Sequence, residues 1–480
     1  MKKSMMVAAA LLAWATGCSS TGEGPGGKLP GTPTGPTDSS GNAVSAAAVN
    51  KFNGALDGMA QHDKAGDWNE ASCTATAAAF VEAAKEQGDK TFGEALYNAG
   101  LANQRCKKDK EAKELFKQVL DKDPKFHRAR SQLALYAFAE SGEKNFDQAI
   151  SEMRQAAITD AQFKNVEALV NLGMLYIKRN NQTADSEGPT DLGRAKKYIQ
   201  SALAVDDGFM PAFNQLAILY METANQKAGR DAKRKTATSG AKQKKVDTQA
   251  LELAALVCSQ AMRKNANYAP IHNTAGLIQN ELGQINGAVS EFAQAAKLDS
   301  KFFEAQMNYA AVNLGFRGFE QAAQAYKKAL AMRPNDYDAH LGLSLAIRGP
   351  ITGAEGNYDA LVSGAQAELD AAKKIDPNRP DAYYNEGILT QEFKAKGSLD
   401  KEKQKALLRD SQKIFQSFID KASGKPEYDG AVKRSKERIQ DIDDTLKFMD
   451  LGVDEQKSAA PAGAAPAGVA PAPAAPAGGN

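Results

Sequence analysis

Two neighbouring stretches decide the fold of this chain: GLIQNELGQINGAVSEFAQA at residues 276–295 and AAVNLGFRGFEQAAQAYKKA at residues 310–329. Both begin with a small residue, and further matching positions start twelve residues after it. The matching pairs, each 34 residues apart, are Gly276 and Ala310, Ala288 and Ala322, Phe292 and Tyr326, and Ala295 and Ala329. A period of this length is typical of an array of paired helices.

The spacing has a direct physical meaning. A unit of about 34 residues forms two short antiparallel helices, whose apolar faces are covered only when the next unit stacks on them. Small residues at the eighth and twentieth positions let the two helices approach, and a bulky residue at the twenty-fourth fills the space towards the neighbouring unit. The pattern resembles the tetratricopeptide repeat (TPR) family. This resemblance implies an all-α fold, an α-α superhelix or TPR solenoid.

The same pattern returns with loops of varying length, so we expect about eight TPR motifs over residues 93–426. A complete copy carries the family's characteristic residues at Leu96, Gly100, Ala112, Phe116 and Pro124. Residues 43–92 and 427–450 flank the array. We predict that they are caps, a degenerate helix pair and one charged helix, because a solenoid needs polar outer faces at its ends.

The N-terminus carries a second strong signal. Lys2 and Lys3 precede an apolar run, which indicates a signal peptide over residues 1–17 that is too short for a permanent membrane span. The residues up to Cys18 resemble the lipobox of bacterial lipoproteins, which implies that Cys18 is acylated, with palmitate for example, and holds the protein on a membrane. By the same resemblance, Ser19 implies the periplasmic side of the outer membrane. An ordinary signal peptide followed by an unmodified Cys18 is the alternative.

Both ends outside the array are poor in apolar residues. Residues 18–42 consist mostly of Gly, Pro, Ser and Thr, and residues 451–480 mostly of Ala, Pro and Gly. Such segments bury too little surface to offset the entropy lost on ordering. We therefore predict a disordered N-terminal tether and a disordered C-terminal Ala/Pro-rich tail. The tail crosses the peptidoglycan, meets a partner or has no specific role.

The charge of the chain argues against nucleic acid as a partner. The 60 Lys and Arg residues face 58 Asp and Glu residues, and removal of Lys2 and Lys3 with the signal peptide leaves 58 of each. A neutral chain gives no global reason to bind nucleic acid. The exception is a predicted basic loop at residues 225–247, in which Asp231 is the only acid between Lys227 and Lys245. Its cations are Lys227, Arg230, Lys233, Arg234, Lys235, Lys242, Lys244 and Lys245. The loop either binds lipid phosphates or an acidic partner, or is a solvated connection between two helices.

Besides Cys18, three cysteines remain after processing, in a compartment that permits disulfides. Cys73 and Cys106 are interpreted as nearly equivalent positions in successive units, which a regular stack keeps ~8–10 Å apart. A disulfide needs Cα atoms closer than ~7 Å, so we expect a bond only if the irregular first unit shortens this spacing. Cys258 takes a bulky core position and is interpreted as an inert buried thiol.

The sequence contains no recognisable catalytic or metal-binding motif. The histidines are far apart and lack a metal-ligand spacing: they are His62, His127, His272 and His340. His272 and His340 share the fourth position of their units, which favours a packing role. No phosphate-binding Gly-rich loop precedes a Lys-Ser or Lys-Thr pair. We therefore expect no enzyme activity, no cofactor, no metal and no small-molecule substrate.

The first helices of the units line the concave face of a TPR superhelix, and such faces bind extended peptides or partner helices. The sixth position of these helices carries an amide side chain in five units: Asn98, Asn171, Gln215, Asn308 and Asn385. An amide has donors and an acceptor, so a row of them can pair with the backbone of an extended chain. We predict a partner-binding groove along this row, although Asn is also the residue that the family prefers there. The Lys and Asn positions by which chaperone-binding relatives hold an acidic C-terminus are not evident.

These features lead to a functional hypothesis. The acylated cysteine, the tether, the irregular repeats and the Ala/Pro-rich tail together resemble the TPR lipoproteins of myxobacterial envelopes, including one of the adventurous gliding-motility machinery. The resemblance implies a non-catalytic scaffold that holds envelope proteins together. The alternatives are a pilotin-type assembly factor for a secretin or type IV pilus, and an adaptor for peptidoglycan hydrolases.

Overall fold

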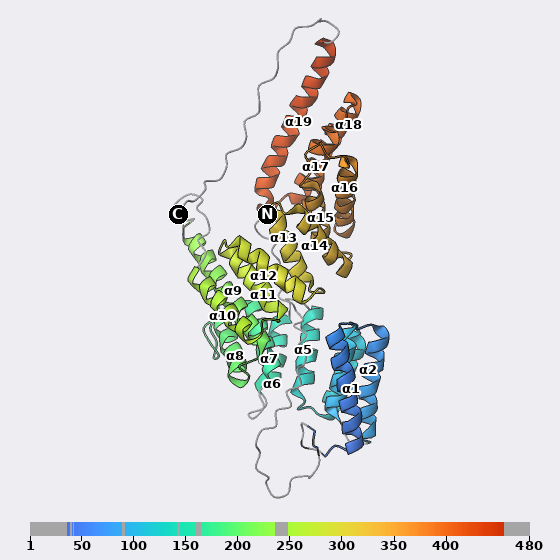
Figure 1. Cartoon of the computed structure of the whole chain (residues 1–480). Helices are drawn as coiled ribbons and strands as arrows, with labels where there is room; N and C mark the ends of the chain where they lie inside the picture. The colour runs from blue at the N-terminus through green and yellow to red at the C-terminus, as the bar shows by residue number, and fades with distance from the viewer. Residues whose placement is uncertain are drawn as a thin grey trace. The chain divides into compact units, whose positions relative to one another are not determined.

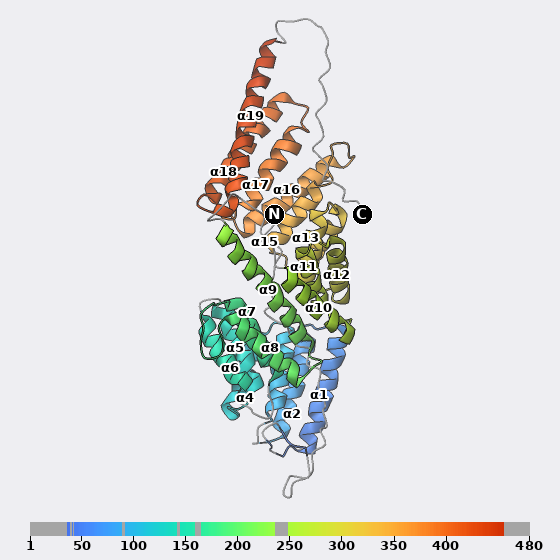
Figure 2. The same ribbon diagram turned by 90° about the vertical axis from the view of Figure 1, so that its left-hand side faces the viewer.

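The computed structural model describes residues 36–38, 41, 43–88, 92–141, 145–158, 165–235 and 248–455, without the side chains of 141, 158, 227–235 and 451–455. Figures 1 and 2 show these residues as a succession of helices. Within them, the only strand-type pairs are two isolated antiparallel bridges, Thr37 with Ala43 and Asp185 with Gly188. The all-α prediction is therefore confirmed. The chain divides into two compact units, Met1–Val312 and Asn313–Asn480.

The first unit is built from helices that pack on their neighbours in sequence (Figure 1). It begins with α1 (Ala46–Ala65), α2 (Glu70–Glu86), α3 (Gly93–Arg105), α4 (Asp109–Lys122), α5 (His127–Ser141) and α6 (Phe146–Ile158). It continues with α7 (Val166–Arg179), α8 (Asp191–Val205), α9 (Met210–Lys235), α10 (Thr248–Lys264), α11 (Ala269–Glu281) and α12 (Ile285–Leu298). The next helix, α13 (Phe303–Gly315), contains the boundary between the units.

The second unit repeats this construction. Its helices are α14 (Phe319–Met332), α15 (Tyr337–Arg348), α16 (Tyr358–Ile375), α17 (Asp381–Leu389), α18 (Lys401–Ala422) and α19 (Asp429–Glu455). One turn of π-helix, η2 (Thr390–Ala395), continues α17, and a short 3-10 turn, η3 (Pro426–Tyr428), precedes α19. In sequence order, the described helices α3 to α18 make eight consecutive pairs.

Small residues bring the two helices of a pair together, as the sequence pattern requires. A Cβ atom added to Gly276 on α11 would lie 2.7 Å from the ring of Phe292 on α12. In the second unit, a Cβ on Gly387 would lie 2.6 Å from the ring of Phe415 on α18. Both rings are fully buried. The repeated small and bulky positions therefore form the core of the helix pairs, because the ring occupies the space that a larger residue would need.

Two boundaries differ from the sequence prediction. The predicted tether is folded near its end, since the backbone N of Val44 donates to the O of Pro36 at 2.8 Å and the Val44 side chain is buried. The final helix α19 runs to Glu455, beyond the predicted end at residue 450. The signal peptide, Cys18 and residues beyond 455 lie outside the described part of the chain.

The described part of the predicted basic loop, residues 225–235, is helix. The long helix α9 continues to its last residue, Lys235, because Ala, Lys and Arg are good helix formers. Five of the predicted cations therefore lie on α9: Lys227, Arg230, Lys233, Arg234 and Lys235. Lys242, Lys244 and Lys245 lie outside the described residues. None of the helices in the described part of the chain is both long and apolar enough to span a membrane.

Candidate partner-binding face

Two of the five predicted groove amides are tied to their own helix. The Nδ2 atom of Asn98 on α3 donates to the backbone O of Glu94 at 2.7 Å. The Nδ2 atom of Asn385 on α17 donates to the backbone O of Asp381 at 2.9 Å. Both side chains are half-buried. One donor of each amide is therefore already used within the helix, which leaves fewer groups for an incoming chain.

The structure differs from the predicted row of accessible amides at two further positions. Asn308 on α13 is only 2 % exposed, and its Nδ2 donates to Oδ1 of Asn273 on α11 at 2.9 Å. Gln215 on α9 is 6 % exposed. The Asn308 amide bonds to the preceding first helix instead of facing solvent, and for this reason it does not offer its donor to a partner. Asn171 on α7 is half-buried, and within the described residues its side chain makes no hydrogen bond.

Polar side chains join consecutive first helices in several places. Gln104 on α3 donates through Nε2 to Oε1 of Gln132 on α5 at 3.1 Å. Thr274 on α11 donates through Oγ1 to Oδ1 of Asn214 on α9 at 2.7 Å. These contacts were not predicted from the sequence. Their positions could have been found, because Gln132 and Thr274 hold the sixth position of their units, two residues before Ala134 and Gly276.

In the second unit, the predicted groove residue Asn385 lies beside an arginine. Arg348, the last residue of α15, donates to Asn385 through Nη1 to the backbone O at 3.1 Å and through Nη2 to Oδ1 at 3.3 Å. From α19, Arg434 donates through Nε to the hydroxyl of Tyr384 on α17 at 3.3 Å. Arg438, one turn later, donates to Oε1 of Gln391 at 2.6 Å. We call Arg348, Arg434 and Arg438 the arginine cluster.

The environment of Arg348 disfavours its charged form. Burial lowers the pKa of its guanidinium to about 10, and the nearby charge of Arg438 acts in the same direction. Arg438 itself forms an ion pair with Glu392 on η2 at 2.8 Å. Neither Arg348 nor Arg438 belongs to the row of sixth positions. The sequence analysis missed the cluster because its members are far apart in the chain and no motif connects them.

The two histidines that share the fourth position make the same contacts in the two units. Nδ1 of His272 lies 2.6 Å from Oε2 of Glu291, and its Nε2 lies 2.9 Å from the backbone O of Ala266. Nδ1 of His340 lies 2.6 Å from Oε2 of Glu368. The hydrogen bond to Glu291 raises the pKa of His272, because only a protonated ring donates from both nitrogens. Within the described residues, no group of three or more His, Cys, Asp or Glu side chains is placed to hold a metal ion.

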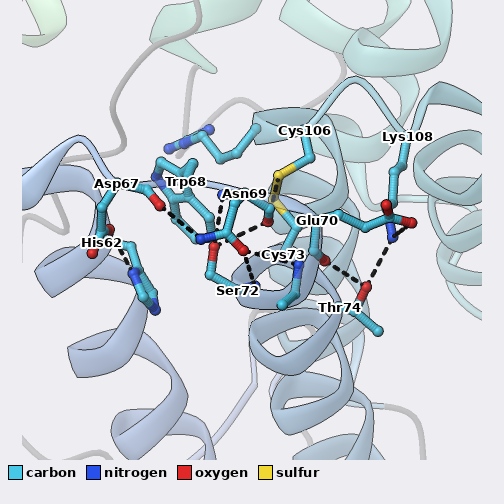
Figure 3. Close-up of a disulfide and its surroundings, with 12 residues drawn as sticks. His62, Asp67, Trp68, Asn69, Glu70, Ser72, Cys73, Thr74, Cys106 and Lys108 are labelled. Carbon is cyan, nitrogen blue, oxygen red and sulfur yellow. Dashed lines mark hydrogen bonds and ion pairs between the residues drawn. A yellow bond between two sulfur atoms is a disulfide. The ribbon is translucent and has the colours of Figure 1, made fainter.

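Cys73 and Cys106 form a disulfide with a Cα–Cα distance of 6.3 Å (Figure 3). The two positions are not equivalent, contrary to our interpretation of the sequence. Cys73 lies in the first turn of α2, the second helix of its pair, and Cys106 directly follows α3, the first helix of the next pair. Because consecutive helices run antiparallel, the start of α2 lies beside the end of α3. Cys258 is buried, and burial raises the pKa of its thiol to about 12.

A buried charge network fixes the long turn between α7 and α8. Arg194 on α8 is 1 % exposed and donates to Oδ1 of Asp185 at 2.8 Å and to Oδ1 of Asp191 at 2.6 Å. Its Nη2 also donates to the backbone O of Thr183 and of Gly188, at 2.8 Å each. Since the guanidinium is paired with carboxylates and carbonyls, its role in this turn is structural.

Comparisons with known proteins bear on the fold. Residues 93–126, which contain α3 and α4, match the family model of the tetratricopeptide repeat. No curated protein matches the chain. Similar solved structures include TTC0263, a thermophilic TPR protein from Thermus thermophilus. It is 22 % identical, with 46 % of this chain and 98 % of that chain covered and a TM-score of 0.35.

Two further solved structures are similar to this chain at comparable values. YrrB, "a TPR protein with an unusual peptide-binding site", is 18 % identical, with 45 % of this chain and 91 % of that chain covered and a TM-score of 0.31. The pilF protein of Pseudomonas aeruginosa is 15 % identical, with 52 % of this chain and 92 % of that chain covered and a TM-score of 0.35. At these values the similarity says nothing about what this chain binds.

The class of fold follows from the helix pairs and the matched repeat. The described helices are arranged as the helix pairs of a tetratricopeptide-repeat solenoid, and residues 93–126 match the model of one such repeat. Repeats of this class bind peptides or protein partners and are generally scaffolds without catalytic chemistry. The fold therefore indicates a protein–protein interaction scaffold.

Proposed function

We propose that the chain is a non-catalytic scaffold that holds envelope proteins together on the periplasmic side of a bacterial outer membrane, anchored by an acylated Cys18. The observation that supports binding is that the first helices of both units carry polar side chains. Such side chains can recognise the backbone and polar groups of a partner. The lipobox-like residues before Cys18 support the anchor.

The partner complex that we propose is an envelope machine, with gliding-motility machinery as the first candidate. This proposal rests on the layout of the chain, which combines a lipobox, a tether, a repeat array and an Ala/Pro-rich tail. In such a complex the scaffold is passive. It supplies a fixed position and a binding face, while other subunits supply force.

Crosslinking in intact envelopes, followed by recovery of the chain, tests the scaffold. We expect specific recovery of motility subunits with the wild-type chain. The variant Asn171→Leu should reduce this recovery and keep the helical circular dichroism, because the half-buried Asn171 amide has no internal partner within the described residues. Gln118→Leu is the matched control, since Gln118 is exposed on α4, the second helix of its pair.

The outcomes of the recovery are distinct. Equal loss of partners in both variants would contradict binding through the first helices. Recovery of a secretin, or of peptidoglycan hydrolases, would replace the motility machinery by that system and would keep the scaffold role. No specific recovery with the wild-type chain would refute the scaffold.

The anchor has an independent test. A Cys18→Ser variant lacks the thiol that is acylated, so we expect it to leave the membrane fraction and to lose incorporation of a labelled fatty acid. Continued fractionation with lipid by the variant would contradict acylation as the anchor. Exchange of Ser19 for Ala is the control, because it leaves the thiol in place.

A further inference from the structure

The arginine cluster brings three cations from two distant parts of the second unit to one place. Arg348 ends α15, whereas Arg434 and Arg438 lie one turn apart on α19. Between them, α17 contributes Tyr384, which accepts from Arg434, and Asn385, which accepts from Arg348. Two of the guanidinium groups therefore contact neighbouring residues of α17, and that of Arg438 contacts Gln391 and Glu392 on η2, which continues α17.

Carboxylates do not balance this charge. Within the described residues, neither Arg348 nor Arg434 has a carboxylate oxygen within 4.0 Å. Arg438 shares Glu392 with Lys396, which also forms an ion pair with that carboxylate. The cluster thus carries a net positive charge.

The neighbouring acids on α17 are engaged elsewhere. Asp381 accepts a hydrogen bond from the hydroxyl of Tyr428 at 3.0 Å and lies 3.5 Å from Nε of Arg379. Glu386 accepts from Nζ of Lys373 at 2.7 Å and from Nε2 of Gln366, also at 2.7 Å. Neither carboxylate is therefore available to neutralise the cluster.

Arg348 is an exception among the shielded arginines of the second unit. Its hydrogen bonds go to two neutral oxygens of Asn385, whereas Arg379 has the carboxylate of Asp338 at 2.5 Å. Removing a cation from water without a counter-charge is unfavourable. The lowered pKa of Arg348 reflects the same cost. An anion bound beside Arg348 would supply the missing counter-charge and so remove this energetic cost.

We propose that the arginine cluster binds the carboxylate side chains of an acidic segment of a partner protein. This inference rests on the proposed scaffold role and names the chemistry of its partner. A guanidinium holds a carboxylate through two parallel hydrogen bonds, and the remaining N–H groups of the cluster point to such a ligand. The arginine cluster is not part of the predicted row of amides. Of that row, only Asn385 contacts the cluster.

The spacing of the cluster favours an extended chain over a single small anion. Arg434 and Arg438 are four residues apart on α19, which corresponds to about 6 Å along the helix. Alternate side chains of an extended segment are about 7 Å apart. Two acidic residues separated by one position would therefore each meet one arginine of α19, and a third would meet Arg348.

Binding of a synthetic peptide to the purified full chain tests the site. The probe is a labelled peptide with three Glu residues alternating with Ser, and its counterpart has Gln in place of Glu. By fluorescence anisotropy we expect the Glu peptide to bind wild type and the Gln peptide to bind at least tenfold more weakly. Arg348→Gln and Arg434→Gln should each weaken the Glu peptide about tenfold, which corresponds to one charge-assisted contact.

Lys433→Gln is the matched control. Lys433 is on the same helix, its side chain is 81 % exposed, and it lies 3.9 Å from Glu437 instead of in the cluster. We expect less than a twofold change with this variant. Because Arg434 is exposed and has no structural ion pair within the described residues, Arg434→Gln tests binding even if Arg348→Gln perturbs folding.

Several results would overturn the inference. These are equal binding of the Glu and Gln peptides, equal weakening by the control, no effect of Arg434→Gln, or binding of inorganic phosphate without binding of the peptide. Its failure is distinguishable from that of the scaffold role. If Arg348→Gln and Arg434→Gln recover the same crosslinked envelope proteins as wild type, the scaffold stands and the arginine site falls.

Discussion

A shielded arginine occurs both in the turn between α7 and α8 and in the arginine cluster of the second unit. The two sites differ in whether carboxylates neutralise the charge of that arginine. In the turn, Arg194 has Asp185 and Asp191 within 2.8 Å and two backbone carbonyls as further acceptors. In the cluster, Arg348 has only the neutral oxygens of Asn385. The first charge is fully compensated by the chain itself, and the second is not.

The difference separates a structural role from a binding role. A buried ion pair strongly destabilises the protein when one partner is removed, because the remaining charge is left without compensation. An arginine that has no carboxylate partner already carries an uncompensated charge. Removal of this arginine therefore relieves an energetic cost of folding. An uncompensated charge in a folded protein favours a binding role over a structural one, which is the physical basis of the proposed acidic partner.

The largest effect is therefore expected from Asp191→Ala. It removes the carboxylate that Arg179 and Arg194 share, and Asp191 is fully buried. We expect the free energy of unfolding to fall by about 3–5 kcal/mol, measured by urea unfolding followed by circular dichroism. Arg348→Gln should change it by less than about 1 kcal/mol, because no ion pair is broken.

Asp147→Ala is the control for the turn. Asp147 also forms an ion pair with Arg179, but its side chain is 91 % exposed. We expect at most about 0.5 kcal/mol from this exposed pair. If Arg348→Gln destabilised the protein as much as Asp191→Ala, the two arginines would be alike, and the contrast between structure and binding would fail.

The fold was predictable because its signal is repeated. Gly276 and Phe292 make the same contact in space as Gly100 and Phe116, and both pairs have the same spacing of 16 residues in the sequence. The continuation of α9 to Lys235 was not predicted, because a run of Lys residues is compatible with either helix or loop. The period fixes the core of each helix pair, whereas the length of an insertion's helix depends on weak local preferences.

The binding face was less predictable than the core. The sixth positions were located correctly on first helices, but periodicity does not tell whether an amide faces solvent or bonds to the next helix, as Asn308 does. Arg348 and Arg438 come together only through the packing of α15, α17 and α19. Contacts between residues that share no regular spacing cannot be recognised from the periodicity of a single sequence.

An intermediate effect on stability is expected from the disulfide between Cys73 and Cys106, a covalent cross-link in the first unit. The bond closes a segment of 33 residues and so restricts the unfolded chain. We expect the variant Cys73→Ser/Cys106→Ser to lose about 2–4 kcal/mol in urea unfolding. Reduction of wild type should have the same effect, and the double variant should show no further loss in reductant. A loss on reduction that persists in the double variant would assign the effect to another group.

The smallest effect is expected from His272, whose charge is compensated by Glu291 in the first unit. The hydrogen bond to Glu291 raises the folded pKa of His272 above the unfolded value of about 6.5, although burial opposes the shift. A protonated His272 therefore stabilises the fold fully below pH 6.5, and this contribution is lost as the pH rises through the folded pKa.

Replacement of His272 by Gln tests this sign. We expect the variant to be about 1 kcal/mol less stable than wild type at pH 5.5, and we expect this difference to shrink at pH 8.5. Urea unfolding of both proteins at the two pH values measures it, and the difference between the proteins removes the contribution of every other titrating group. If the stability difference between wild type and variant instead increased towards pH 8.5, the fold would favour the neutral form of His272. The environment of His272 would then disfavour charge, as that of Arg348 does.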